Sequence, residues 1–325
     1  MIENGKKLYN EEVEKWNDRK PLLILSFINI NNNISINNLL RNMQRVEGRG
    51  DWALIDYTQT ATPRLCSPLV EKGAIYCKSA KIKRDKMKGI PKPLMYGDVL
   101  PILKNYKYVF VLDEDISFRD FNLSAYMTYH DCAFSPSPPP LVSQPLIAES
   151  TQDFNYLNYN SWKNQIKHKG IVAVQSPFIE QQVPYFNSLF FQWLIQYVLP
   201  PSFPLARQTE SSWGPDNIWC GAAKTFASKV LGYNPKTYIS CAIILKGHAI
   251  HHLNLHTIRA KKKNKANFQE GGFRMHRYFR SNYGDWFEWG RNNSRNPLHS
   301  TKFNFTRVYA THQGCMERYQ EFIAQ

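Results

Sequence analysis

The segment 108–118, YVFVLDEDISF, runs five apolar residues directly into three consecutive acids. A short apolar run of this kind predicts a strand that is buried on both faces, as in a parallel sheet. Three adjacent carboxylates repel one another, and a carboxylate in a low-dielectric setting is costly unless a partner offsets it. Two interpretations follow: an acidic surface turn, or a site for a cation.

Several further apolar runs have the length of a strand and are separated by segments with helical spacing. The expected strands are 21–30, 51–58, 73–79 and 106–113, with 171–182 a strand followed by a turn and 238–254 a strand that runs into a histidine cluster. The expected helices are 10–19, 39–47, 93–105 and 184–200, and 213–227 begins with a turn and continues as a helix. The Asn-rich stretch after the first strand reads as a loop. Near-continuous apolar strands that alternate with helices predict an α/β fold with a mostly parallel central sheet flanked by helices.

The chain of 325 residues divides by composition into three parts. We expect an N-terminal leader over 1–20 and a catalytic domain over 21–256, with a first half at about 21–126 and a second at about 141–256. A basic, aromatic extension follows over 257–325. The net charge of +15 favours polyanionic partners such as nucleic acid, a membrane surface, an acidic glycan or a diphosphate.

The compartment follows from what the sequence lacks. It contains no apolar run long enough to span a membrane, and its polar start has no apolar core of a secretory signal, so a cytoplasmic location is expected. The six cysteines are scattered without a C-x-x-C pair, which argues against zinc and against a disulfide framework and predicts reduced, buried thiols. The sequons at Asn33, Asn122, Asn292 and Asn304 would then be coincidental.

The acids at the end of the 106–113 strand are the first candidate site. Residues i and i+2 of a strand face the same side, so Asp113 and Asp115 can approach one metal ion. Carboxylate and water ligands suit Mn²⁺ or Mg²⁺, and two carboxylates leave positions for diphosphate oxygens. Acidic clusters at strand ends also hold metal in nucleases and polymerases, and a D-x-D pair is common by chance.

The surrounding blocks carry a resemblance. Residues 74–126 resemble the nucleotide-sugar half of glycosyltransferases with the A-type fold. Six blocks occur in the order of an uncharacterised plant and algal family of that fold, sometimes labelled lysine-ketoglutarate-reductase trans-splicing-related: WALIDYT, YVFVLDEDISFRDFN, LVSQPLI, VQSPFIEQQ, WGPDNIWCGAA and AIHHLN. The resemblance covers roughly residues 21–256. The SPSPPP insertion, the His-rich stretch and the tail depart from that family.

The resemblance implies roles for three residues. Lys92, about two dozen residues before the acids, would contact the donor diphosphate. Asp216, in WGPD, would line the acceptor side and act as general base; alternatively it only caps a helix. His251 stands where a C-terminal histidine completes the metal site with Asp113 and Asp115 in many A-type enzymes; alternatively it is a solvated loop histidine.

The remaining assignments complete the hypothesis. Ser26 and Asp56, at the first two strand ends, would flank the nucleotide base and ribose, and Glu114 would join them in donor binding. Trp213 or Trp219 would stack on acceptor sugars. We therefore expect a metal-dependent glycosyltransferase that moves a sugar from a UDP-linked nucleotide-sugar to a glycan acceptor. Two alternatives stay open: a nucleic-acid-binding or nucleotide-processing protein that uses the basic surface, and a non-catalytic sugar or nucleotide binder.

Overall fold

The molecule is organised around one large sheet. The computed structural model describes residues 1–83, 87, 90–148, 162–163, 166, 171–246, 249–253, 265–286, 307–308 and 315. Its strands are β1 Lys20–Ile28, β2 Asp51–Asp56, β3 Ala74–Ser79, β4 Tyr106–Asp113, β5 Ile116–Ser117, β6 Val142–Pro145, β7 Ala173–Gln175, β8 Tyr185–Asn187, β9 Cys241–Ile244, β10 His251–His252 and β11 Arg307–Val308.

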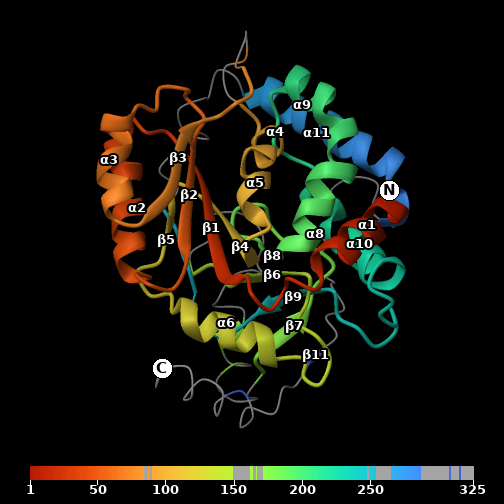
Figure 1. Ribbon diagram of the computed structural model, residues 1–325. Coiled ribbons are helices and arrows are strands. Elements are labelled where there is room, and N and C mark those ends of the chain that lie inside the picture. Colours follow the sequence, from red (N-terminus) through yellow and green to blue (C-terminus); the bar gives the residue numbers. More distant parts are fainter. Residues whose placement is uncertain are drawn as a thin grey trace.

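The helices flank this sheet in two groups (Figure 1). The α-helices are α1 Ile2–Glu12, α2 Asn33–Arg45, α3 Pro63–Glu71, α4 Lys92–Met95, α5 Leu100–Leu103, α6 Leu123–Cys132, α8 Ser188–Trp193, α9 Phe203–Thr209, α10 Asp216–Lys229 and α11 Lys265–Asn282. Short turns of other helix types are η1 Tyr96–Val99, η3 Leu194–Val198, η4 Pro200–Ser202 and η5 Gly284–Trp286.

Nine strands form the central sheet in the order β11-β7-β9-β6-β8-β4-β1-β2-β3. Strands β1 to β4 pair in parallel, as do β6 and β9. Only β7 and β8 run against the other seven, because each pairs antiparallel with both of its neighbours. The predicted α/β fold with a mostly parallel, helix-flanked sheet is confirmed.

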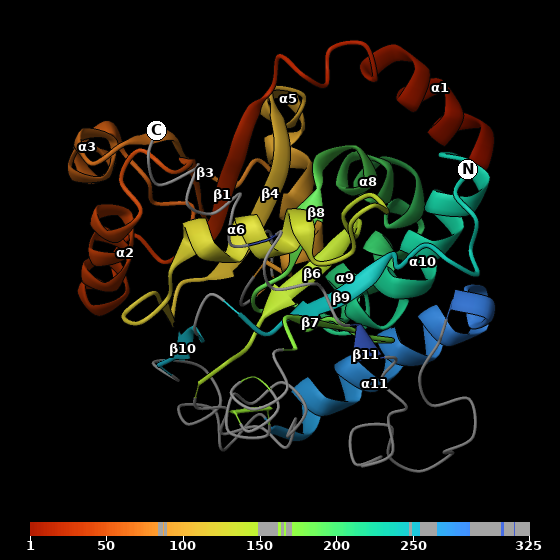
Figure 2. The ribbon, with the colours of Figure 1, turned by 90° about the horizontal axis from the view of Figure 1, so that it is seen from below.

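Alternating side chains bury both faces of the sheet. In β1, Leu23 and Leu25 enter one hydrophobic core, and Leu22 and Ile24 enter the other. All four are at most 1% exposed. The first core receives side chains of α4, α8 and α10, and the second those of α2 and α6. Figure 2 shows α2 to the left of β1 and β4, and α8 and α10 to their right. Burial on both faces explains why these strands read as continuous apolar runs.

Several predicted elements differ from the structure. The expected helix over 10–19 is wrong, because α1 ends at Glu12 and residues 13–19 form turns and bends. Helix α2 begins at Asn33, inside the expected loop, because the Asn32 side chain accepts the N–H groups of Ile34 and Ser35 and caps the helix. The expected helix over 93–105 is three short turns, α4, η1 and α5. The expected helix over 184–200 starts with strand β8, because residues 185–187 pair with β4 and β6 before α8 begins.

The prediction of reduced cysteines is wrong. The six cysteines form three disulfides, Cys66–Cys77, Cys132–Cys315 and Cys220–Cys241. The first two partners lie on α3 and β3, and the last two on α10 and β9, so the fold brings together thiols that no spacing motif connects.

The described parts of the tail pack against the rest of the fold. Met275 and Phe279 of α11 are fully buried in the first core, and β11 pairs with β7 at the sheet edge. Cys315 is joined to α6 through Cys132. The basic run 259–265 lies, apart from Lys265, outside the described residues. Among the described residues, no helix is long and apolar enough to cross a membrane.

Candidate functional site

Charged side chains gather where β4 ends, at the edge formed by the carboxyl ends of the parallel strands. Lys92, the first residue of α4, makes an ion pair with Asp113, the last residue of β4. Its Nζ also donates to the Gln181 carbonyl over 3.4 Å, and its backbone N–H donates to Ser212 Oγ over 3.0 Å. This edge is where open α/β sheets place their ligands.

Lys92 is the positive centre of this cluster. Its side chain is only 16% exposed. Burial lowers the pKa of Lys92 to about 8, against the opposing effect of nearby carboxylates. These carboxylates belong to Asp115, Glu180, Asp216 and Glu114. The predicted site residues from β4 and from α10 therefore do converge around the predicted lysine.

Asp115 is held by the second histidine of the HH pair. Strand β10 pairs antiparallel with β5, with His252 opposite Ile116 and His251 opposite Ser117. His252 Nε2 lies 3.3 Å from Asp115 Oδ2. Burial alone would raise the pKa of Asp115, but the hydrogen bond and charge of His252, with the charge of Lys92, hold it below its usual value.

His251 faces the other way. Its Nε2 lies 2.6 Å from Asp120 Oδ2, and the Arg119 guanidinium is 3.4 Å from its Nδ1. His251 was expected beside Asp113 and Asp115, whereas the structure brings His252 to Asp115. Neighbouring residues of a strand point to opposite sides, so the register of the β5–β10 pair decides which histidine is presented.

Asp216 begins α10 after the expected Gly-Pro turn. Gly214 takes a left-handed backbone with φ of 105°, and its N–H donates to Asp216 Oδ1 over 3.2 Å. Asn217 Nδ2 donates to the same oxygen over 3.2 Å. Burial nevertheless raises the pKa of Asp216. The side chain keeps partial exposure, so a ligand can reach it.

Glu180 is a further acid of this cluster, which was not predicted from the sequence. It follows β7, is 6% exposed, and its backbone N–H donates to Gln144 Oε1 over 2.6 Å. Burial raises the pKa of Glu180, and the negative charge of Asp216 raises it further. The signal was available: Glu180 stands in a turn directly after a predicted strand, as the β4 acids do.

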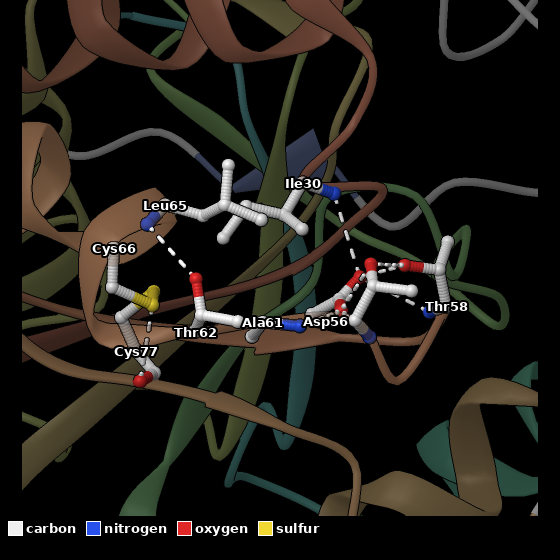
Figure 3. The surroundings of a disulfide bond; sticks show 9 residues. Ile30, Asp56, Thr58, Ala61, Thr62, Leu65, Cys66 and Cys77 are labelled. Carbon is white, nitrogen blue, oxygen red and sulfur yellow. Dashed lines mark hydrogen bonds between the residues drawn. A yellow bond between two sulfur atoms is a disulfide. The ribbon is translucent and has the colours of Figure 1, made fainter.

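Two predicted donor-binding residues are engaged inside the protein. The Asp56 carboxylate is fully buried and accepts hydrogen bonds from backbone N–H groups of its own loop, including those of Thr60 at 2.7 Å and Ala61 at 2.8 Å (Figure 3). Ser26 is 1% exposed, and its Oγ donates to the Leu112 carbonyl over 3.3 Å. Neither side chain is directed to a ligand in this arrangement.

Glu114 also connects strand ends rather than standing free. Its Oε2 accepts the Asn29 N–H over 2.7 Å, and its Oε1 accepts the Tyr57 hydroxyl over 2.7 Å. Burial, with the nearby charge of Glu114, raises the pKa of Tyr57. Glu114 therefore ties the loops after β1 and β2 to the end of β4 and shapes the edge where a donor would lie.

The two expected stacking residues differ. Trp219 is 1% exposed and packs edge-on against Phe186 with ring centroids 5.0 Å apart, so it belongs to the core. Trp213 is half-buried beside the Gly-Pro turn. Its ring lies against Gly272 of α11, where an added Cβ would come within 2.2 Å of Cε3. Of the two, only Trp213 retains a surface that a sugar can contact.

The donor atoms fit a cation that is shared with a substrate. Among the described residues no group of three or more His, Cys, Asp or Glu side chains is arranged to hold a metal ion. The Asp115 carboxylate and the His252 imidazole nevertheless converge, and both are donors that Mn²⁺ accepts. Ions of this class are commonly held by one or two carboxylates together with substrate phosphates and water.

Comparisons with known proteins give similarity in structure only. No family model matches the chain, which leaves the resemblance to the plant and algal family without support, and no curated protein matches it. A mannosyltransferase of Pyrobaculum calidifontis, solved with GDP-Man and Mn²⁺, is 11% identical with a TM-score of 0.36, over 74% of this chain and 65% of that one.

Two further solved structures are similar to the same extent. TarS residues 1–349 of S. aureus are 10% identical with a TM-score of 0.37, over 81% of this chain and 74% of that one. The mannosyltransferase Ktr4p of S. cerevisiae is 11% identical with a TM-score of 0.30, over 62% of this chain and 70% of that one.

Proposed function

We propose that the chain is a glycosyltransferase that moves a sugar from a nucleotide-sugar to a hydroxyl group of a glycan. One observation carries this proposal: a buried lysine, the acids of the β4 end and Asp216 of α10 meet at the carboxyl edge of the sheet. A donor diphosphate needs positive charge, and an attacking hydroxyl needs a base. This cluster offers both within one site.

Lys92 would bind the diphosphate. Its ammonium now pairs with Asp113, and phosphate oxygens would provide an alternative set of negative partners in the same low-dielectric setting. Asp115 and His252 would hold a divalent cation, Mn²⁺ or Mg²⁺, with Asp113 beside them. When bound, the cation neutralises negative charge on the departing nucleotide diphosphate.

Asp216 would be the general base. Burial raises the pKa of Asp216 toward neutral pH. A carboxylate with such a pKa is ionised in a useful fraction of molecules and is basic enough to accept a proton. The N–H groups of Gly214 and Asn217 support its ionised form. The acceptor oxygen would attack the anomeric carbon as the bond to the diphosphate breaks, and the hydroxyl proton would pass to Asp216. A single displacement of this kind inverts the anomeric centre.

Glu180 would assist Asp216 as a protonated neighbour. Because burial and Asp216 both raise its pKa, Glu180 holds its proton more tightly than an exposed glutamate does. A protonated Glu180 adds no second negative charge beside Asp216 and can donate a hydrogen bond. Trp213 would offer an aromatic face to the acceptor at the mouth of the site. The donor nucleotide proposed is UDP.

The test is release of UDP or GDP from a panel of nucleotide-sugars by the purified protein with Mn²⁺, with EDTA as a control. We expect turnover of one donor, loss of turnover in Asp115→Ala, and a fall of 10²–10⁴-fold in kcat for Asp216→Asn. No turnover of any donor, with strongly salt-dependent binding to nucleic acid instead, would contradict the proposal.

A matched pair of variants tests the metal assignment. His252→Ala removes the imidazole that meets Asp115, whereas His251→Ala removes one that meets Asp120. We expect His252→Ala to weaken Mn²⁺ binding, measured by titration calorimetry in the presence of UDP, and His251→Ala to leave it near the wild-type value. Equal losses in both variants, or a loss only in His251→Ala, would refute the assignment to His252.

A further inference from the structure

The disulfides bear on where this chain folds. Each of the six cysteines has a partner within the chain, and each of the three disulfides joins two different segments of the fold. Cys66 and Cys77 join α3 to β3 beside the Asp56 loop (Figure 3). Disulfides form and persist in oxidising compartments and are rare where glutathione and thioredoxin keep thiols reduced.

In such a compartment the sequons become substrates. N-linked glycosylation requires Asn-x-Ser or Asn-x-Thr, with x other than proline. Four sequons occur, and those at Asn292 and Asn304 lie outside the described residues. The other two, at Asn33 and Asn122, differ in their surroundings.

Asn33 is placed to carry a bulky group. It is exposed at the first position of α2, where Asn32 rather than Asn33 provides the capping oxygen. The next residue, Ile34, is 63% exposed, the largest exposed fraction among the large hydrophobic side chains of the described residues. A glycan on Asn33 would cover part of this apolar surface, and its attachment would break no contact of the helix cap.

Asn122 is less suited. It is half-buried, and its side-chain oxygen accepts the Ala125 N–H over 2.9 Å to cap α6. A glycan there would have to leave through the turn between β5 and α6. The two sequons therefore form a natural comparison between an exposed asparagine and one that is partly enclosed.

We infer that this protein matures in an oxidising, glycosylating compartment and carries an N-linked glycan on Asn33. Each disulfide forms as two thiols lose two protons and two electrons to the disulfide of an oxidoreductase, which is reduced to its dithiol. At Asn33 the side-chain Nδ2 attacks the first sugar of a lipid-diphosphate-linked oligosaccharide. The Nδ2–C1 bond forms, the C1–O bond to the diphosphate breaks, the lipid diphosphate leaves, and the amide loses one proton. This inference is independent of the proposed function.

The direct test is a peptide map of the protein isolated from the cells that make it. Free thiols are alkylated first, peptides are separated without reductant, and glycans are removed by peptide-N-glycosidase in H₂¹⁸O. We expect a disulfide-linked pair of peptides containing Cys66 and Cys77, and conversion of Asn33 to ¹⁸O-labelled aspartate. Alkylated Cys66 and Cys77, or an Asn33 peptide without label, would overturn the inference.

A second measurement uses the full chain directed into the secretory pathway of a eukaryotic cell. Digestion with the same glycosidase should increase the electrophoretic mobility of the protein, and partial digestion should give a ladder of bands that differ by one glycan each. Asn33→Gln should remove one band from this ladder. Asn122→Gln is the matched control and should leave that glycan in place. Asn33 is exposed at a helix start, so Asn33→Gln should still fold; an unchanged ladder in that variant would refute glycosylation at Asn33.

Discussion

The buried side chain of His130 should make the stability of the protein depend on pH. The imidazole of α6 is fully buried among tyrosine rings, with centroids 4.8 Å from Tyr185 and 5.2 Å from Tyr108. Its Nδ1 lies 2.9 Å from Ser143 Oγ, and its Nε2 is buried with no hydrogen-bond partner. Burial lowers the pKa of His130 to about 3, because the charged ring would leave a second N–H donor unsatisfied.

The sign and size follow from proton linkage. The unfolded chain binds a proton on His130 below pH 6.5, whereas the folded chain does so only near pH 3. The free energy of unfolding therefore loses the contribution of this group as pH falls from 6.5 toward 3. Integrating between pH 7.5 and pH 5, with these two pKa values, gives a loss of about 2 kcal/mol from His130 alone.

The measurement is urea unfolding of wild type and His130→Gln at pH 7.5 and at pH 5, with disulfides intact. Other acids contribute to both proteins, so the difference between the two losses isolates His130. Glutamine is close in size to histidine, can bond Ser143 and does not titrate. We expect the variant to lose about 2 kcal/mol less than wild type over this range. Equal losses would refute the argument that His130 is buried in its neutral form.

Four further outcomes are expected. Asp216→Asn should remove the acidic limb of the pH profile of kcat/KM, whose midpoint should lie above the usual pKa of aspartate because burial raises the pKa of Asp216; a limb near pH 4 in wild type would contradict this. Trp219→Ala should lower the free energy of unfolding by about 3–5 kcal/mol in urea titration, as for a core tryptophan, and a near-neutral result would return Trp219 to the acceptor surface. Asp56→Ala should destabilise the protein by more than about 2 kcal/mol, since the buried carboxylate is the acceptor for the N–H groups of Ile30, Thr58, Thr60 and Ala61, and a loss confined to donor affinity would restore the ligand-binding interpretation. Cys66→Ser should cost about 2–3 kcal/mol in thermal or urea unfolding without reductant, and a near-neutral result would contradict a stabilising disulfide between Cys66 and Cys77.

Local pattern was sufficient for most of the sheet. The runs at 106–113 and 51–58 are apolar on both faces, so their strand character and parallel pairing could be predicted before any partner was known. The same reasoning placed Asp113 and Asp115 at a strand end and Asp216 at a helix start. These predictions depend on periodicity and turn chemistry, which act over a few residues.

The choice of which polar group faces the site depended on contacts that are distant in sequence. His252 rather than His251 meets Asp115 because β10 pairs with β5 in one register. Glu180 joins Asp216 only because the segment that follows β7 and the start of α10 lie at the same edge. Asp56 and Ser26 stand at strand ends as predicted. The Asp56 carboxylate is hydrogen-bonded by its own loop, however, and the Ser26 hydroxyl is hydrogen-bonded to the neighbouring strand β4.

The cysteines show the same division most clearly. The sequence by itself determined that six thiols exist, that none forms a C-x-x-C motif, and that the central sheet would be buried on both faces. Only the tertiary structure decided that those thiols pair, because α3 lies on β3, α10 on β9 and residue 315 beside α6. A disulfide requires two Cβ atoms within about 4 Å, and chain packing, not spacing in the sequence, sets that distance.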